Sequence, residues 1–158
     1  MRRLNMIALF LLCGLIETAF SSASEKLGPT FEPVNEIPEG KAVVYIYRSD
    51  NFAQVYIVRA NGQNLINLRS SSYFPFVCAP GSIQFTAKVK FKFGSTGLLN
   101  KAWSAEKSIQ LEIKEGKVYY LKGFPSYSPE LTQRMELIEL DPEEAIAEIQ
   151  HTHLAPSN

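Results

Sequence analysis

The run AVVYIYR at residues 42–48 decides the fold of this chain. It is rich in β-branched and aromatic side chains, a composition typical of β-strands. The apolar residues occupy both faces of the run instead of alternating with polar ones. Because a strand that is apolar on both faces must be covered on both, we predict a buried central strand here.

Further strand signals follow this run along the chain. Asn61-Gly62 is the strongest short signal for a hairpin, because both residues tolerate a positive φ. Pro75 has no N–H to donate to a ladder and therefore favours an edge position. Residues 83–93 alternate between apolar and polar side chains, as a strand with one buried face does. Together the signals predict strands at residues 41–48, 54–60, 65–68, 72–78, 83–93, 104–113, 117–124 and 131–140.

A helix is predicted directly after the last of these strands. Asp141 can cap its start, and Pro142 suits its first turn. Ala145, Ile146 and Ile149 would form an apolar stripe that docks on the sheet, which so short a helix needs for stability. The sequence therefore predicts an all-β fold, an antiparallel β-sandwich of about seven to eight strands with one short C-terminal helix.

The predicted sandwich domain spans residues 41–150. Residues 24–40 contain three prolines and two glycines and predict an extended linker. Residues 151–158 carry no strand or helix signal and predict a loose tail.

Residues 1–23 have the order of a secretory signal peptide. Arg2 and Arg3 supply the positive start, residues 6–16 the apolar core, and Ser21-Ser22-Ala23 the small residues before cleavage. Because the apolar run is too short to cross a bilayer, we predict an exported protein of the periplasm or cell envelope, without a transmembrane span in the mature chain. The 16 basic and 16 acidic residues give no general attraction for nucleic acid.

The two cysteines lead to different predictions. Cys13 lies in the leader, and a lipid anchor on it is the alternative to cleavage after Ala23, although Leu12 fits poorly where a lipoprotein leader has a small residue. Cleavage after Ala23 leaves Cys78, whose apolar neighbours predict a buried thiol. A thiol-dependent hydrolase that uses Cys78 with a histidine lacks a third, orienting group in the sequence.

Five short segments, in this order and spacing, resemble a known family. The chain is similar over roughly residues 38–140 to the bacterial family called domain of unknown function 2846. The family consists of small exported proteins that often carry a lipoprotein leader. The resemblance implies an envelope location and a β-sandwich, and it implies no activity and no functional residues. The segments are Lys41–Arg48, Asn61-Gly62, Ser72-Tyr73-Phe74, Ala79-Pro80-Gly81 and Gly116–Leu121.

Other candidate sites each have a simpler interpretation. Lys88, Lys90 and Lys92 share one strand face and form a candidate anion patch for lipid head groups or polysaccharide, or simply a solvated face. His151 and His153 are too few for a stable zinc site and are expected in an exposed tail.

The strand tyrosines form a candidate carbohydrate platform, or a core boundary. We find no catalytic or cofactor motif and predict no cofactor. The sequence thus predicts a non-enzymatic binding or scaffolding module of the cell envelope, with an envelope protein, lipid or polysaccharide as its partner.

Overall fold

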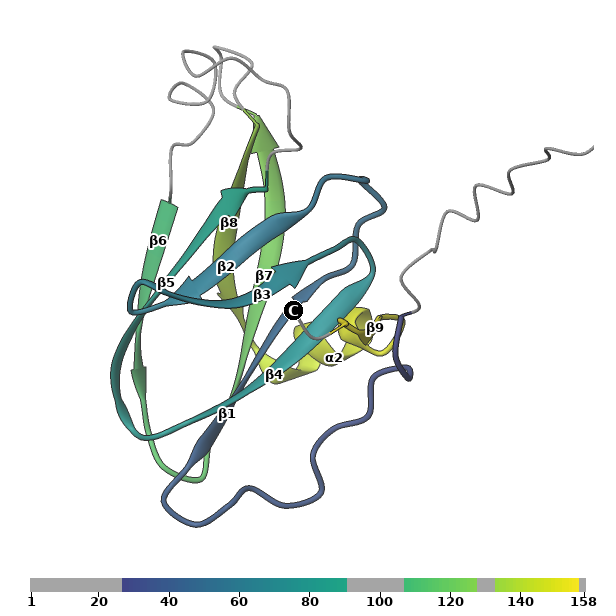
Figure 1. The fold of residues 1–158 in the computed structure, drawn as a ribbon. Coiled ribbons are helices and arrows are strands. Elements are labelled where there is room, and N and C mark those ends of the chain that lie inside the picture. Colours follow the sequence, from purple (N-terminus) through teal and green to yellow (C-terminus); the bar gives the residue numbers. More distant parts are fainter. Residues whose placement is uncertain (1–26, 91–106, 128–132, 157–158) are drawn as a thin grey trace, which may run out of the picture.

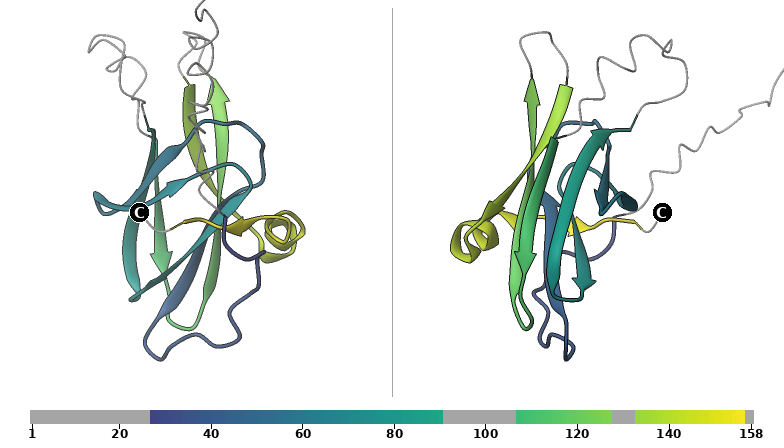
Figure 2. Two further views of the ribbon diagram at one scale, coloured as in Figure 1. Left: turned by 45° about the vertical axis from the view of Figure 1, so that its right-hand side comes forward. Right: turned by 90° about the vertical axis from the view of Figure 1, so that its left-hand side faces the viewer.

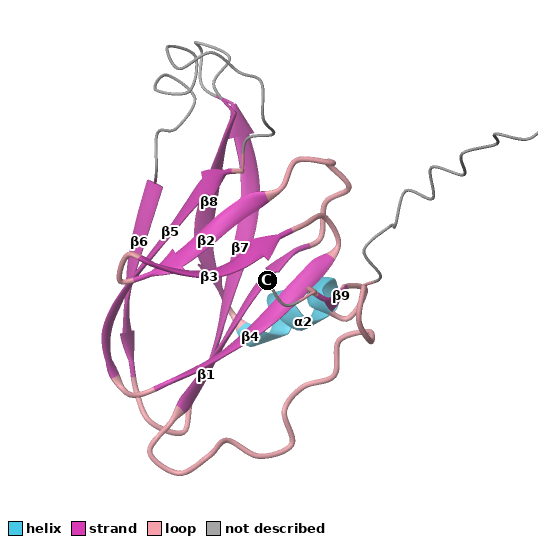
Figure 3. Ribbon diagram, viewed as in Figure 1, coloured by secondary structure: helices cyan, strands magenta, loops and turns pink. Residues whose placement is uncertain are grey.

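The computed structural model describes residues 27–90, 107–127 and 133–156, and within them it confirms the predicted all-β sandwich (Figure 1). Strands make up most of these residues, and the helix of the described part lies to one side of them (Figure 3). The elements are β1 (Ala42–Arg48), β2 (Tyr56–Ala60), β3 (Gln63–Leu68), β4 (Ser72–Cys78), β5 (Gly81–Val89), β6 (Lys107–Ile113), β7 (Val118–Tyr127), β8 (Gln133–Leu140), α2 (Pro142–Ile149) and β9 (His153–Leu154).

The strands form a five-stranded sheet in the order β8-β7-β1-β4-β9 and a four-stranded sheet in the order β3-β2-β5-β6. The predicted central strand is β1, the middle strand of the larger sheet. Most neighbouring pairs are antiparallel, as predicted, but β1 with β7 and β4 with β9 are parallel. The parallel pair β1–β7 arises because the chain passes from β6 in one sheet directly to β7 in the other.

The main core lies between the two sheets. Alternate residues of β1, such as Val44 and Ile46, meet residues of the opposite sheet, such as Phe85, and all three are fully buried. Phe76 and Phe85 pack edge to face across the core with ring centroids 6.0 Å apart. This apolar interior supplies the principal driving force for folding.

A second apolar cluster covers the outer face of the five-stranded sheet. Phe31 packs edge to face on Tyr45 and Tyr73 at centroid distances of 5.0 and 5.2 Å. Tyr120 stacks on Tyr45 at 5.5 Å. Helix α2 completes the cover, and Figure 2 shows it on the side of this sheet turned away from the other sheet. Because both faces of β1 are covered, its run of apolar residues is explained.

Helix α2 starts where the sequence predicts, but without the predicted side-chain cap. The Asp141 carboxylate makes no capping hydrogen bond, whereas its backbone carbonyl accepts one from Ala145 N–H. Ala145 and Ile149 face the sheet and are buried. Ile146, predicted as part of the same stripe, is 42% exposed because it lies on the flank of the helix.

The predicted linker and tail are packed against each other, so both predictions need correction for the described residues. His153 and Leu154 form β9, which pairs with the start of β4. Gly28 N–H donates to the Leu154 carbonyl at 2.9 Å, and Leu154 N–H donates to the Pro29 carbonyl at 2.8 Å. A Cβ on Gly28 would lie 2.8 Å from Leu154 Cβ, so this close approach requires glycine.

Two prolines lie inside strands, each at a position where no neighbouring described strand would accept a backbone hydrogen bond from that residue. The carbonyls of Ser71 and Tyr73 accept hydrogen bonds from the C-terminal segment, so they point toward the β9 side of β4. Because backbone groups alternate along a strand, those of Pro75 point to the same side, beyond the last β9 residue. The predicted edge position is therefore confirmed for Pro75 itself, because the pairing of β4 with β9 ends at Tyr73. The strand predicted at residues 117–124 extends farther than expected, because β7 continues through Pro125 to Tyr127. Pro125 faces the side of β1, whose pairing with β7 ends at Lys122.

Candidate functional site

The predicted lysine patch is only partly described. Lys88 is half-buried on the outer face of the four-stranded sheet, and Lys90 is exposed directly after the end of β5. Lys92 lies outside the described residues. Lys107, close by in sequence, points instead toward β8 and pairs with Glu136, which lowers the pKa of that carboxyl. The anion patch of Lys88, Lys90 and Lys92 therefore stays a prediction, and the structure describes two of its three lysines.

The structure separates Cys78 from the histidines. Cys78 is buried, as predicted, and burial raises the pKa of its thiol, only partly offset by the charge of Lys41. His153 pairs with Ser72 at the opposite end of β4, six residues from Cys78. At about 3.3 Å per residue the two side chains start some 20 Å apart, too far for a nucleophile–base pair.

Two polar clusters that sequence reasoning missed hold the framework together. The buried Arg48 guanidinium binds Asp50 and fixes the loop after β1. Glu148 on α2 accepts hydrogen bonds from Lys122 Nζ at 2.6 Å and Ser49 Oγ at 3.0 Å, which ties the helix to the five-stranded sheet. Burial, together with the charge of Glu148, raises the pKa of the neighbouring Tyr47.

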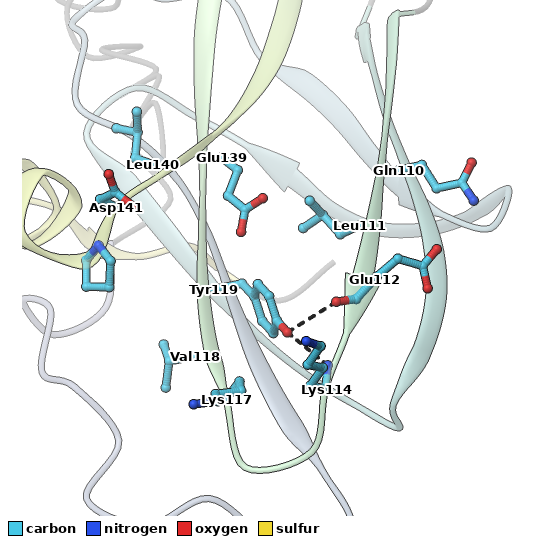
Figure 4. A pocket seen from close by; sticks show the side chains of 11 residues that line it. Gln110, Leu111, Glu112, Lys114, Lys117, Val118, Tyr119, Glu139, Leu140 and Asp141 are labelled. Atoms are coloured by element: carbon cyan, nitrogen blue, oxygen red, sulfur yellow. Dashed lines mark hydrogen bonds between the residues drawn. The ribbon is translucent and has the colours of Figure 1, made fainter.

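An open cavity of about 460 Å³ lies where the ends of β6 and β8 face each other, and we call it the β6–β8 groove (Figure 4). The two strands are edge strands of different sheets, and no other strand of the described part of the chain separates them here. Its volume falls within the range of about 300–1,000 Å³ that is usual for ligand sites. The groove is lined by Gln110, Leu111, Glu112, Lys114, Lys117, Val118, Tyr119, Glu139, Leu140, Asp141 and Pro142.

Three side chains point into the groove from its two walls. Figure 4 shows Leu111 of β6, Tyr119 of β7 and Glu139 of β8 turned toward the common space, whereas the side chains of Gln110 and Glu112 turn away. Leu111 is buried and Glu139 is exposed. The interior therefore combines an aliphatic group, an aromatic ring and one carboxylate.

The Tyr119 hydroxyl holds the end of β6. It accepts a hydrogen bond from Lys114 N–H at 2.9 Å and donates one to the Glu112 carbonyl at 3.2 Å. These two backbone groups therefore point off the edge of β6, away from β5. Tyr119 thus covers part of an otherwise unpaired strand edge.

The alternation of the strands shows which backbone groups of β6 face the groove. Gln84 exchanges hydrogen bonds with Asn61, so its backbone groups face β2. Its neighbour Ile83 therefore faces β6, where it pairs with Leu111. It follows that the N–H and C=O of Gln110, next to Leu111, point off the free edge.

The other wall of the groove also presents a backbone edge, that of β8. The Lys117 carbonyl accepts from Val43 N–H, so Tyr120 faces β8 and forms its ladder bonds with Leu140. The N–H and C=O of Glu139 consequently point off the edge of β8. The groove thus presents strand edges from both sheets.

The sequence contained one signal for this site. Glu139 follows Met135 and Leu137 in the alternation that points into the sandwich, and a carboxylate at such a position is unusual. That β6 and β8 face each other depends on the order of the strands in the two sheets, and local sequence patterns do not determine this order.

Comparisons with known proteins leave the family open. No protein-family model matches the chain, and no curated protein matches it either. The resemblance to domain of unknown function 2846 accordingly stays a prediction.

Across residues 27–90, 107–127 and 133–156, no helix has the length and apolar character that would let it cross a membrane. The same residues contain no group of three or more His, Cys, Asp or Glu that could hold a metal ion. The predicted leader and Cys13 lie outside these ranges.

Proposed function

We propose that this protein is an exported, non-enzymatic binding module of the cell envelope and that the β6–β8 groove is its binding site. The groove carries the proposal, because it is a cavity of ligand size, lined by polar and apolar groups together and bordered by strand edges that have no partner strand among the described residues. The distance between Cys78 and His153 along β4 speaks against the alternative of a thiol-dependent hydrolase.

The export part of the proposal depends on the leader in the sequence. Recovery of the chain from its native host by cell fractionation, with intact mass and N-terminal sequencing, tests it. A chain that begins near Ser24 in the soluble exported fraction supports a free module. An acylated chain that begins at Cys13 in the membrane fraction supports the lipid-anchored alternative, and a full-length chain in the cytoplasm overturns export.

The binding part is tested by backbone NMR of the labelled protein against three probes: short peptides, polysaccharide fragments and anionic lipid vesicles. We expect one probe to shift the amide signals of Gln110, Glu112 and Glu139, with the probe recovered chemically unchanged. The amides of Lys88 and Lys90 are the internal control, because a vesicle that shifts only these binds the lysine patch and not the groove. Turnover of a probe, or no shift in the groove with any probe, overturns the proposal.

A further inference from the structure

We propose that the occupant of the β6–β8 groove is an extended peptide that adds as a strand to β6 and places a basic side chain against Glu139. The inference rests on the proposed function and names the ligand class. Two independent features of the groove point to it, one in the backbone and one in the side chains.

The backbone feature is the free edge of β6. β6 has β5 as its partner on one side, and the N–H and C=O of Gln110 and the N–H of Glu112 point to the other side, into the groove. A donor–acceptor row of this kind is complementary to the backbone of an extended peptide, which supplies the same groups at the same spacing. A sugar or a lipid head group has no such repeat.

The side-chain feature is the chemistry of the interior. The half-buried ring of Tyr119 offers an apolar surface with the buried Leu111 behind it, and Glu139 offers a carboxylate beside the ring (Figure 4). Lysine and arginine match this combination, since their stems are aliphatic and their ends are cationic. The ring of Tyr119 adds a further attraction for a cation.

The hairpin end of the groove has the opposite charge. Lys114 and Lys117 line it, on the turn between β6 and β7. These ammonium groups repel a basic residue there, so the basic side chain of the peptide is directed toward Glu139. The charges therefore give the peptide a defined placement as well as affinity.

The first experiment identifies and modifies the peptide while the protein stays wild type. A displayed library of random short peptides is selected on the folded protein, and the best sequence is synthesised with N-methyl groups at single positions. Strand addition predicts that alternate N-methyl groups abolish binding, because only alternate amides face β6. It also predicts slower amide exchange at Gln110 and Glu112 in the complex. Binding that tolerates every N-methyl group overturns strand addition.

Matched proline variants then test the edge. Gln110→Pro removes one N–H that faces the groove and no ladder bond to β5, so the strand tolerates it. We expect binding to weaken by about tenfold or more. Val77→Pro is the control, because Val77 lies on the unpaired part of the β4 edge, outside the groove, and its N–H also faces away from the sheet. Equal loss of binding in both variants contradicts the proposal.

The charge is tested by a double-mutant cycle. Glu139→Gln should weaken binding by up to about fivefold for the peptide with its basic residue. The variant should bind a peptide with norleucine at that position as tightly as the wild type does. Equal effects on both peptides overturn the role of Glu139.

The outcomes also separate this inference from the proposed function. If no peptide is selected but a polysaccharide fragment or vesicle shifts the groove amides, the ligand class is wrong and the binding module stands. If none of the probes shifts the groove amides, both proposals fail.

Discussion

The buried ion pair at the end of β1 allows a sharp test of the energetics. The Arg48 side chain is fully buried, lies over the Tyr56 ring with its guanidinium carbon 4.9 Å from the centroid, and binds Asp50 through Nε at 2.9 Å and through Nη2. Nη1 also donates to the Gln54 carbonyl at 2.6 Å and Nη2 to the Phe52 carbonyl at 3.1 Å. We predict that Asp50→Ala destabilises the fold more than Arg48→Met does.

The expected magnitudes follow from what each change leaves behind. Asp50→Ala leaves a buried guanidinium without its counter-charge, which costs about 3–5 kcal/mol in comparable sites. The Asp50 side chain is 19% exposed, and Arg48 keeps two carbonyl acceptors, so we expect the lower end, about 3 kcal/mol. Arg48→Met removes the buried charge and replaces the side chain with an apolar one that reaches about as far as the arginine Nε. We expect this variant to lose about 1 kcal/mol of stability through its missing hydrogen bonds, because the acceptors that Arg48 leaves lie in a surface loop that water can reach.

Urea denaturation followed by circular dichroism measures the difference. With a slope of about 2 kcal/mol per molar urea, Asp50→Ala should lower the midpoint by about 1.5 M and Arg48→Met by about 0.5 M. The double variant should be more stable than Asp50→Ala alone, because it no longer contains an uncompensated buried charge. An Arg48→Met variant that loses as much stability as Asp50→Ala would refute the reasoning, provided that the slopes are unchanged.

Three further predictions concern the core. Cys78 should react with an alkylating reagent slowly in the native protein and fully in denaturant, because burial covers the thiol and raises its pKa; rapid native labelling, measured by intact mass, would contradict this. Burial also raises the pKa of Tyr45 and Tyr47, so the folded state favours their neutral forms. That stability is present below about pH 10 and is lost as the pH rises further, so phenolate absorbance should appear together with loss of near-ultraviolet circular dichroism. Gly123→Ala should destabilise by about 1–3 kcal/mol, because its Cβ would lie 2.8 Å from Met135 Sδ; an unchanged thermal midpoint would show that the core yields easily.

Local chemistry made several elements of the fold predictable. Asn61 and Gly62 adopt φ values of 47° and 80° in the turn between β2 and β3, which is the geometry that the dipeptide predicted. The apolar run of β1 predicted a strand covered on both faces, and both faces are covered. In both cases the signal depends on neighbouring residues only, so one sequence contains it.

Long-range pairing explains what the sequence did not show. Residues 153–154 form a strand only because β4 and residues 28–30 lie on either side of them. Such a strand has no local pattern, since its stability comes entirely from its neighbours. The groove is unpredictable for the same reason, because β6 and β8 are edge strands of two sheets whose order the sequence leaves open.

The strand order also relates the groove to the point where the predicted leader would join the described domain. Gly28 pairs beside β9, which is the last strand of the five-stranded sheet, whereas the groove borders β8, the first strand of the same sheet (Figure 1). At about 4.8 Å between neighbouring strands, roughly 20 Å of sheet separates the two edges. A lipid on Cys13, or any other attachment on the N-terminal side, would therefore join the described domain at the sheet edge away from the groove. If the groove binds a peptide as proposed and Cys13 carries a lipid, we expect that removing the lipid leaves the affinity of the groove unchanged.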